Sequence, residues 1–285
     1  MPRRRRLLNV CAGANAAAAA AMMMMPGMNP LLPFVNFPFF PGGPPFLPPQ
    51  PGFGGVGNDT FVVDATGDYI NDTSGTDTIQ TSINYSLVNL AAIENLMTTS
   101  AAGTTNLTLW GNDSANQITG NAGNNIIDGK AGNDTMTGLA GNDTYFVDSA
   151  SDSIVDSAGT DTVKASITYT LGAGLAVEVL QAATTTAAIN LTGNELAQRV
   201  IGSNMANTIS GGLGNDTLTG SGGNDNFLFN TALNSTTNRD TITDYNTIAD
   251  TIRLENTGIF SALGTGTLSA SRFVVGTAAL DSADR

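Results

Sequence analysis

A glycine recurs every nine residues in two separate parts of this chain, and this period limits the fold more than any other feature. The first run repeats at Gly111, Gly120, Gly129 and Gly138, and the second at Gly193, Gly202, Gly211 and Gly220. In each unit the sixth residue is Asp, Asn or Gln and the eighth is apolar. A short unit that repeats in phase predicts a solenoid, because each coil can bury its apolar residue only against the neighbouring coils.

The four most complete units have glycine at positions one and four and aspartate at position six. They are residues 129–134, 138–143, 211–216 and 220–225. Glycine at both positions predicts tight turns with positive φ, and the sixth-position carboxylate adds the hard oxygen ligand that calcium prefers. Turn chemistry between strands would explain this composition too, but it does not explain a fixed acid or amide at position six.

The units resemble the RTX, or hemolysin-type, calcium-binding repeat. The resemblance implies an all-β fold, a right-handed parallel β-roll or β-helix solenoid with calcium-binding turns. In that fold two nonapeptides form one coil, so turns eighteen residues apart stack with Ca²⁺ ions between them. Under this pairing Asp134 faces Asp152, and Asp143 faces Asp161. Pairs that contain an amide, such as Asn116 with Asp134 or Gln198 with Asp216, are expected to be weaker sites.

The predicted calcium ligands are acids, amides and glycines of these turns. The acids are Asp59, Asp68, Asp77, Asp134, Asp143, Asp152, Asp161, Asp216 and Asp225. The amides are Asn116, Asn125 and Asn207, and the glycines are Gly129, Gly132, Gly138, Gly141, Gly211, Gly214, Gly220 and Gly223. Only the nine-residue period supports the outer acids, since their units have lost most glycines. Glu94, Glu178, Glu195 and Glu255 fall outside the predicted ladders.

The chain also repeats at long range, with an offset of 84 residues. Residues 57–61 match 141–145, residues 82–85 match 166–169, and Asn106-Leu107-Thr108 matches Asn190-Leu191-Thr192. After a two-residue deletion the glycine runs align as well. Residues 162–171 between the runs alternate like one β-strand. Each long unit is therefore a block of repeats followed by a strand-rich spacer.

Composition divides the chain into three segments. We expect residues 1–53 to form a disordered, low-complexity tail rich in Ala, Met and Pro, with a degenerate signal peptide as the alternative. Residues 54–228 are the duplicated RTX solenoid. Residues 229–285 lack the glycine period; the stretches 240–245 and 250–254 resemble the C-terminal β-roll segment of serralysin-type proteins, which closes the roll. Whether this segment is truncated at Arg285 stays open.

Charge and residue types exclude several functions. Arg3–Arg6 supply four of the 11 basic residues, and no acid precedes Gly52, so the rest of the chain has 24 acids against 7 bases, a net charge of −17. This acidity argues against nucleic acid as a partner. The chain has no histidine, which removes histidine-based zinc-protease motifs and catalytic triads. No apolar stretch is long enough for an integral membrane span, and we expect no enzyme activity.

The sequence therefore predicts a secreted bacterial calcium-binding protein whose roll folds on binding extracellular calcium. Two alternatives stay open. The chain could be a structural or adhesive surface-layer component, associated with the cell surface or with itself, or the noncatalytic C-terminal module of a secreted protease or toxin. The resemblance implies type I secretion, and calcium ions are the only partner that the residues specify.

Overall fold

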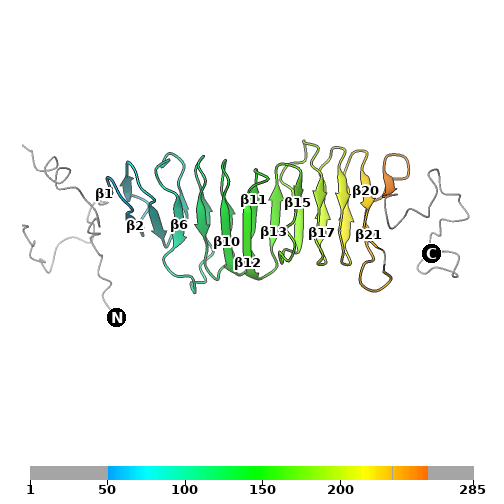
Figure 1. Ribbon diagram of the computed structural model, residues 1–285, viewed down its shortest axis with the longest axis horizontal. Coiled ribbons are helices and arrows are strands. Elements are labelled where there is room, and N and C mark those ends of the chain that lie inside the picture. Colours follow the sequence, from blue (N-terminus) through cyan, green and yellow to red (C-terminus); the bar gives the residue numbers. More distant parts are fainter. Residues whose placement is uncertain (1–50, 233, 256–285) are drawn as a thin grey trace, which may run out of the picture.

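The computed structural model describes residues 51–232 and 234–255 as one elongated all-β solenoid of parallel strands (Figure 1). The strands stack along the long axis of the molecule, each roughly perpendicular to it, and the described part contains no helix. It follows that no helix among these residues could cross a membrane. Two parts of the chain lie outside the described residues. They are residues 1–50 of the predicted tail and residues 256–285 of the predicted C-terminal segment.

Successive strands alternate between two sides of the solenoid, and each side is interrupted once. One side consists of a six-stranded sheet of β2 (Thr60–Val63), β4 (Thr78–Thr81), β6 (Asn95–Thr98), β8 (Gln117–Thr119), β10 (Thr135–Ala140) and β12 (Ser153–Ala158). It continues after a break in a five-stranded sheet of β14 (Tyr169–Thr170), β16 (Leu191–Thr192), β18 (Thr208–Ser210), β20 (Asn226–Phe229) and β22 (Thr251–Leu254).

The other side begins with a two-stranded sheet of β1 (Pro51–Phe53) and β3 (Tyr69–Asn71). After its own break follow β5 (Tyr85–Ser86), β7 (Thr108–Trp110), β9 (Ile126–Asp128), β11 (Thr144–Val147), β13 (Thr162–Ala165), β15 (Val179–Ala182), β17 (Arg199–Ile201), β19 (Thr217–Thr219) and β21 (Thr241–Ile242). Every strand pair is parallel, and within the repeat blocks partners lie eighteen residues apart, as Thr144 and Thr162 do. The predicted two-unit coil is therefore confirmed.

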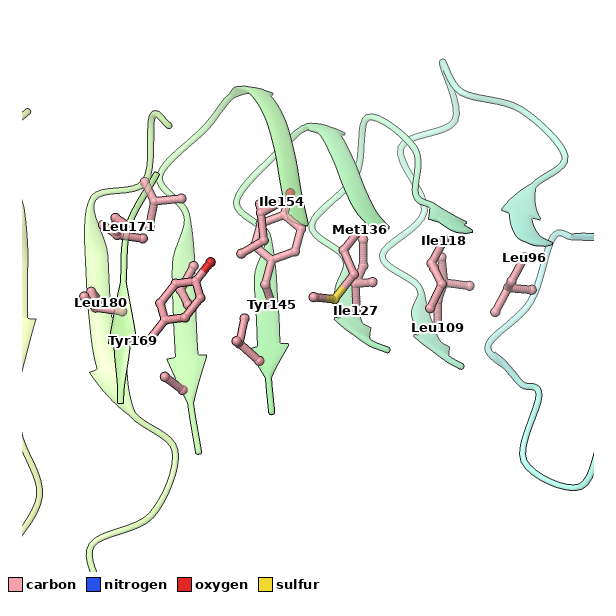
Figure 2. Packing of buried hydrophobic residues seen from close by; sticks show 14 of the residues in the cluster. Leu96, Leu109, Ile118, Ile127, Met136, Tyr145, Ile154, Tyr169, Leu171 and Leu180 are labelled. Atoms are coloured by element: carbon pink, nitrogen blue, oxygen red, sulfur yellow. The ribbon is translucent and has the colours of Figure 1, made fainter. Parts of the chain in front are cut away.

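The eighth position of each repeat forms the core, as the period predicts. Ile118 pairs with Met136 and Met136 with Ile154 on one side, while Ile127 pairs with Tyr145 on the other. Figure 2 shows these side chains in rows between the two sheets. All five belong to the buried cluster that runs through the solenoid. Each coil thus contributes one apolar residue per sheet, and it packs on its two neighbours rather than on a central core.

The 84-residue duplication spans nine strands, so that β2 corresponds to β11 and β5 to β14. A coil contains two strands, and nine strands are therefore four and a half coils. The half coil places equivalent strands on opposite sides: β2 lies in the six-stranded sheet, and β11 in the nine-stranded sheet. Even the breaks are duplicated, since one side stops between β3 and β5 and the other stops nine strands later, between β12 and β14.

The structure refines four details of the sequence prediction. Pro51–Phe53, assigned to the tail, form β1; proline is tolerated as the first residue of a strand at a sheet edge. The boundary after residue 228 falls inside β20, and β21 and β22 continue the same sheets. Residues 162–171 form two strands on opposite sides, because 166–168 turn the chain. Finally, Tyr85 pairs with Leu109, whereas its counterpart Tyr169 pairs with Leu191. Leu109 therefore corresponds to Leu191, and the two-residue deletion falls before this position. The sequence match of Asn106–Thr108 with Asn190–Thr192 is thus displaced by two residues from the structural correspondence.

Two neighbouring isoleucines of β9 test this architecture. Ile127 is fully buried between the sheets, whereas Ile126 is 42% exposed on the outer face. We expect Ile127→Ala to lower the free energy of unfolding by about 2–5 kcal/mol, because it leaves a cavity between coils. The matched variant Ile126→Ala should change it by less than about 0.5 kcal/mol. Denaturant unfolding in saturating calcium measures both, and equal losses would contradict the assigned faces.

Candidate metal centre

The sixth-position residues form ladders along the edges of the solenoid, where the chain turns from one sheet to the other. In each ladder the backbone N–H of one residue donates to a side-chain oxygen of its counterpart one coil further on. Seven predicted pairs have this contact: Asn116 to Asp134 (2.7 Å), Asn125 to Asp143 (2.6 Å), Asp134 to Asp152 (3.1 Å), Asp143 to Asp161 (2.7 Å), Asp59 to Asp77 (2.7 Å), Gln198 to Asp216 (2.7 Å) and Asn207 to Asp225 (2.8 Å). The eighteen-residue facing of these positions is thus seen directly.

Each ladder contact uses only one carboxylate oxygen, and the other is often left without a partner. The Oδ2 atoms of six predicted ligands are buried and accept no hydrogen bond: Asp59, Asp77, Asp134, Asp143, Asp161 and Asp216. Buried polar atoms are almost always hydrogen-bonded, and an unpaired buried charge is costly. A column of orphaned carboxylate oxygens is therefore a feature that a bound cation would explain.

Burial sets the electrostatics of these turns. It raises the pKa of Asp134 and Asp143 to about 6, and that of Asp161 and Asp216 to about 7. The N–H of the ladder lowers each pKa, and neighbouring acids raise it, Asp152 for Asp134 and Asp240 for Asp216. Without a cation, these turns therefore disfavour the ionised form of the aspartates. A cation needs that ionised form as its ligand, so its binding must lower the pKa of these carboxyl groups again.

Glycine has different roles at its two positions, which corrects the sequence prediction. Position-four glycines do adopt positive φ, for example 109° at Gly141 and 107° at Gly214. Position-one glycines do not; a Cβ on Gly129 or Gly211 would collide with the Oδ2 atom of the aspartate in its own repeat. The second positive φ belongs to position two, where Lys130 has 66°. The same geometry holds for Gly132 and Gly223 at position four and for Gly138 and Gly220 at position one.

The predicted amide ligands already have partners inside the protein. The Asn116 Oδ1 atom accepts the backbone N–H of Asn112 (2.7 Å), and its Nδ2 donates to the carbonyl of Ile93 (3.1 Å). Asn125 and Asn207 accept in the same way from the second residue of their own repeats. The amide side chains are therefore satisfied by hydrogen bonds within the protein, whereas most of the aspartate turns leave one oxygen without a partner.

Two predicted acids differ from the others. The Asp68 Oδ2 atom accepts the N–H groups of Asp64 and Ala65, both at 3.1 Å, within its own turn. Its counterpart Asp152 accepts from Ser149 (3.1 Å) with Oδ2 while Oδ1 takes the ladder contact. Neither has the orphaned oxygen found in six of the other seven predicted acids, all except Asp225.

The structure adds acids that the sequence reasoning missed. Glu94 and Glu178 belong to the ladders, accepting the N–H of Asp77 (2.8 Å) and of Asp161 (2.7 Å). Their coils are one residue shorter than eighteen, and the longer glutamate side chain spans the difference. Asp72 and Asp156 join two clusters of three carboxylates. Their common offset of 84 residues was the signal that could have identified them.

The comparisons with known proteins agree with this geometry. The family model of the RTX calcium-binding nonapeptide repeat matches four copies, over residues 110–145 and 193–230. The chain carries RTX calcium-binding nonapeptide repeats. Such repeats bind Ca²⁺, and the buried carboxylates of this RTX solenoid are oxygen ligands of the kind that the ion prefers. No curated protein and no solved structure matches the chain significantly.

The matched repeats cover only part of the solenoid. The coils that contain Asp59, Asp77 and Asp161 lie outside the matched residues but have the same ladder contacts. The serralysin-type resemblance of residues 229–285 stays a prediction, because the family match ends at residue 230.

Position-one glycine can be tested against an unconstrained glycine. We expect Gly129→Ala to raise the calcium concentration at the folding midpoint several-fold, because the new Cβ displaces the Asp134 carboxylate. A Cβ on Gly172 would meet no atom within 4 Å, so Gly172→Ala is the matched control and should leave the midpoint unchanged. Calcium titration followed by circular dichroism measures both, and identical midpoints would contradict the role of Gly129.

The raised pKa values predict an unusual pH dependence for the metal-free protein. Aspartate has a pKa of 3.8 in the unfolded chain but about 6 to 7 in these turns. The folded state therefore binds more protons, so the stability that these groups contribute is fully present below pH 3.8 and is lost as the pH rises through about 7. We expect metal-free protein to gain β-structure on acidification from neutral pH. Circular dichroism against pH checks this, and loss of structure on acidification would contradict it.

Proposed function

We propose that this chain is a noncatalytic calcium-binding RTX roll that folds when it meets calcium outside the cell. One observation carries the proposal: consecutive coils present buried aspartates whose second oxygen has no partner, in phase with the matched RTX repeats. Solenoids of this kind are typical of noncatalytic modules, and the absence of histidine from the sequence agrees with that role.

Electrostatic repulsion supports a role for calcium in folding. Two carboxylates about 4 Å apart repel by roughly 4 kcal/mol at an effective dielectric constant of 20. The ladders stack such groups along a strongly acidic chain, and each coil contacts only its neighbours. Without a cation the coils are driven apart, and the free energy of metal binding becomes free energy of folding.

We assign the calcium ligands to the acid turns rather than the amide turns. The carboxylate ligands of this proposal are Asp59, Asp77, Asp134, Asp143, Asp161, Asp216 and Asp225. Turn carbonyls complete the set; that of Gly129, for example, lies against Gly111 of the preceding coil. Asp68, Asp152 and the three asparagines act mainly by closing their turns with hydrogen bonds.

The proposed compartment follows from expected affinity. Sites built on flexible turns with few carboxylates bind calcium with dissociation constants of about 10⁻⁴ to 10⁻³ M, like other extracellular modules. Such sites are empty at cytosolic calcium and filled outside the cell. Proteins with RTX repeats are generally extracellular, which supports secretion of an unfolded chain that folds after export. We further propose that residues 229–255 are the closing part of the roll.

The test is a calcium titration of the full chain by far-ultraviolet circular dichroism. We expect a disordered spectrum in chelator and a β-rich spectrum in calcium, with a midpoint of about 10⁻⁴ to 10⁻³ M. Asp134→Asn should raise the midpoint, because it removes the charge of an orphaned carboxylate. Asp113→Asn, at an exposed residue of the preceding coil, removes the same charge and should not. Identical spectra in chelator and calcium would disprove calcium-driven folding.

A further inference from the structure

Two aspartates stand where the complete repeats have glycine. Position one of a repeat lies five residues before its sixth-position acid, and at this place the chain has Asp72 before Asp77 and Asp156 before Asp161. Each extra acid joins a ladder pair, which gives the two clusters Asp59–Asp72–Asp77 and Asp143–Asp156–Asp161. In each cluster a carboxylate oxygen of every member lies within 4.8 Å of those of the other two.

Buried oxygens in both clusters have no partner. In the first cluster the Oδ2 atoms of all three aspartates are orphaned, and Asp77 is fully buried. In the second the Oδ2 atoms of Asp143 and Asp161 are orphaned, and both residues are 1% exposed. The ion pairs found among the described residues, Lys130 with Asp128 and Arg253 with Glu255, involve neither cluster. Each cluster therefore collects three acids without a basic partner.

Both clusters lie beside an interruption of the solenoid. Asp72 directly follows β3, the last strand of the two-stranded sheet, and Asp156 lies in β12, the last strand of the six-stranded sheet. The following strands on those sides, β5 and β14, belong to separate sheets. At these two points a coil loses its backbone pairing with the next coil on one side.

We propose that Asp72 and Asp156 complete two three-carboxylate calcium sites, which bind the ion more tightly than the other turns and secure the coils beside the two interruptions. The inference rests on the proposed calcium binding of the roll. It goes beyond the matched repeat, which has glycine at position one. Calcium affinity rises with the number of charged ligands and the rigidity of the site, and each of these clusters holds one carboxylate more than a ladder pair such as Asp134 with Asp152.

A third arrangement of acids shows what these two sites need. Asp225 donates its N–H to Asp250 (3.0 Å), and Asp244 occupies the place of Asp156. Both oxygens of Asp244 are engaged, Oδ1 by the N–H of Gly220 (2.9 Å) and Oδ2 by that of Ser221 (2.7 Å). None of Asp225, Asp244 and Asp250 has a buried oxygen without a partner, whereas the first cluster has three such oxygens and the second has two, so the proposal is limited to those two clusters.

Tyr145 distinguishes one site from the other. Its hydroxyl donates to the Asp156 Oδ2 atom (2.6 Å), and the ring is fully buried. The equivalent residue beside the first cluster, 84 positions earlier, is Phe61. A luminescent lanthanide uses the same oxygen ligands as calcium, and one bound in the second cluster would be excited through Tyr145, whereas one in the first cluster would lack this donor.

The first experiment is a calorimetric calcium titration of the full chain. We expect two tight sites in the wild type. Asp72→Asn and Asp156→Asn should each weaken one of them at least about tenfold, whereas Asp113→Asn, a control with the same charge change, should weaken neither. If both cluster variants titrate like the control while the wild type binds calcium, this inference fails and the proposed function stands. If the wild type binds no calcium, both fail.

The second experiment measures terbium luminescence excited through tyrosine, and its first variant, Tyr145→Phe, leaves the aspartates of both clusters in place. We expect Tyr145→Phe to remove most of the tyrosine-excited signal, with Tyr85→Phe as the matched control that retains it. Asp156→Asn should weaken the signal at low terbium, and Asp72→Asn should leave it unchanged. Wild-type luminescence in Tyr145→Phe, or equal effects of the two aspartate variants, would overturn the assignment.

Discussion

The structure depends on one contact, in which a backbone N–H of one coil donates to the sixth-position side chain of the next, as Asn125 does to Asp143 at 2.6 Å. The contact sets the spacing of the coils and engages one oxygen of the acceptor. In Asp143 and in most of the other aspartate acceptors of the predicted pairs it leaves the other oxygen buried and unpaired. The same interaction that aligns the coils therefore creates a column of acids that repel one another, and the calcium ligation that we propose would resolve this conflict.

The residue at position six decides how each turn is completed. Asparagine has both a donor and an acceptor. The side chains of Asn116 and Asn207 therefore accept an N–H group of their own repeat and donate to a carbonyl of the preceding coil. An aspartate has no donor and cannot do so. Amide turns and acid turns thus share one backbone period but differ in what they require from solution. In the proposed function, the solenoid combines amide coils whose turns are closed by hydrogen bonds with acid coils that bind a cation.

Duplication by nine strands gives the molecule a symmetry that its coils alone would not have. Because nine strands are four and a half coils, the second copy presents each feature on the opposite side, including the sheet interruption and the acid cluster beside it. Asp77 and Asp161 are equivalent in sequence but belong to opposite edges. An even number of strands would have placed both interruptions on the same side of the solenoid.

The nine-residue period by itself indicated a solenoid with a buried eighth position. The resemblance of the repeats to RTX units implied the two-repeat coil and, with it, the facing of Asp134 with Asp152. Tertiary structure alone decided the rest. Short spacers without glycine hid the turn at 166–168 and the shorter coils that bring Glu94 and Glu178 into the ladders. Asp72 and Asp156 looked like losses of glycine, and only stacking showed them beside the acids of another coil. Local period specifies partners one coil away, whereas irregular coils and the half-coil offset depend on how the whole chain stacks.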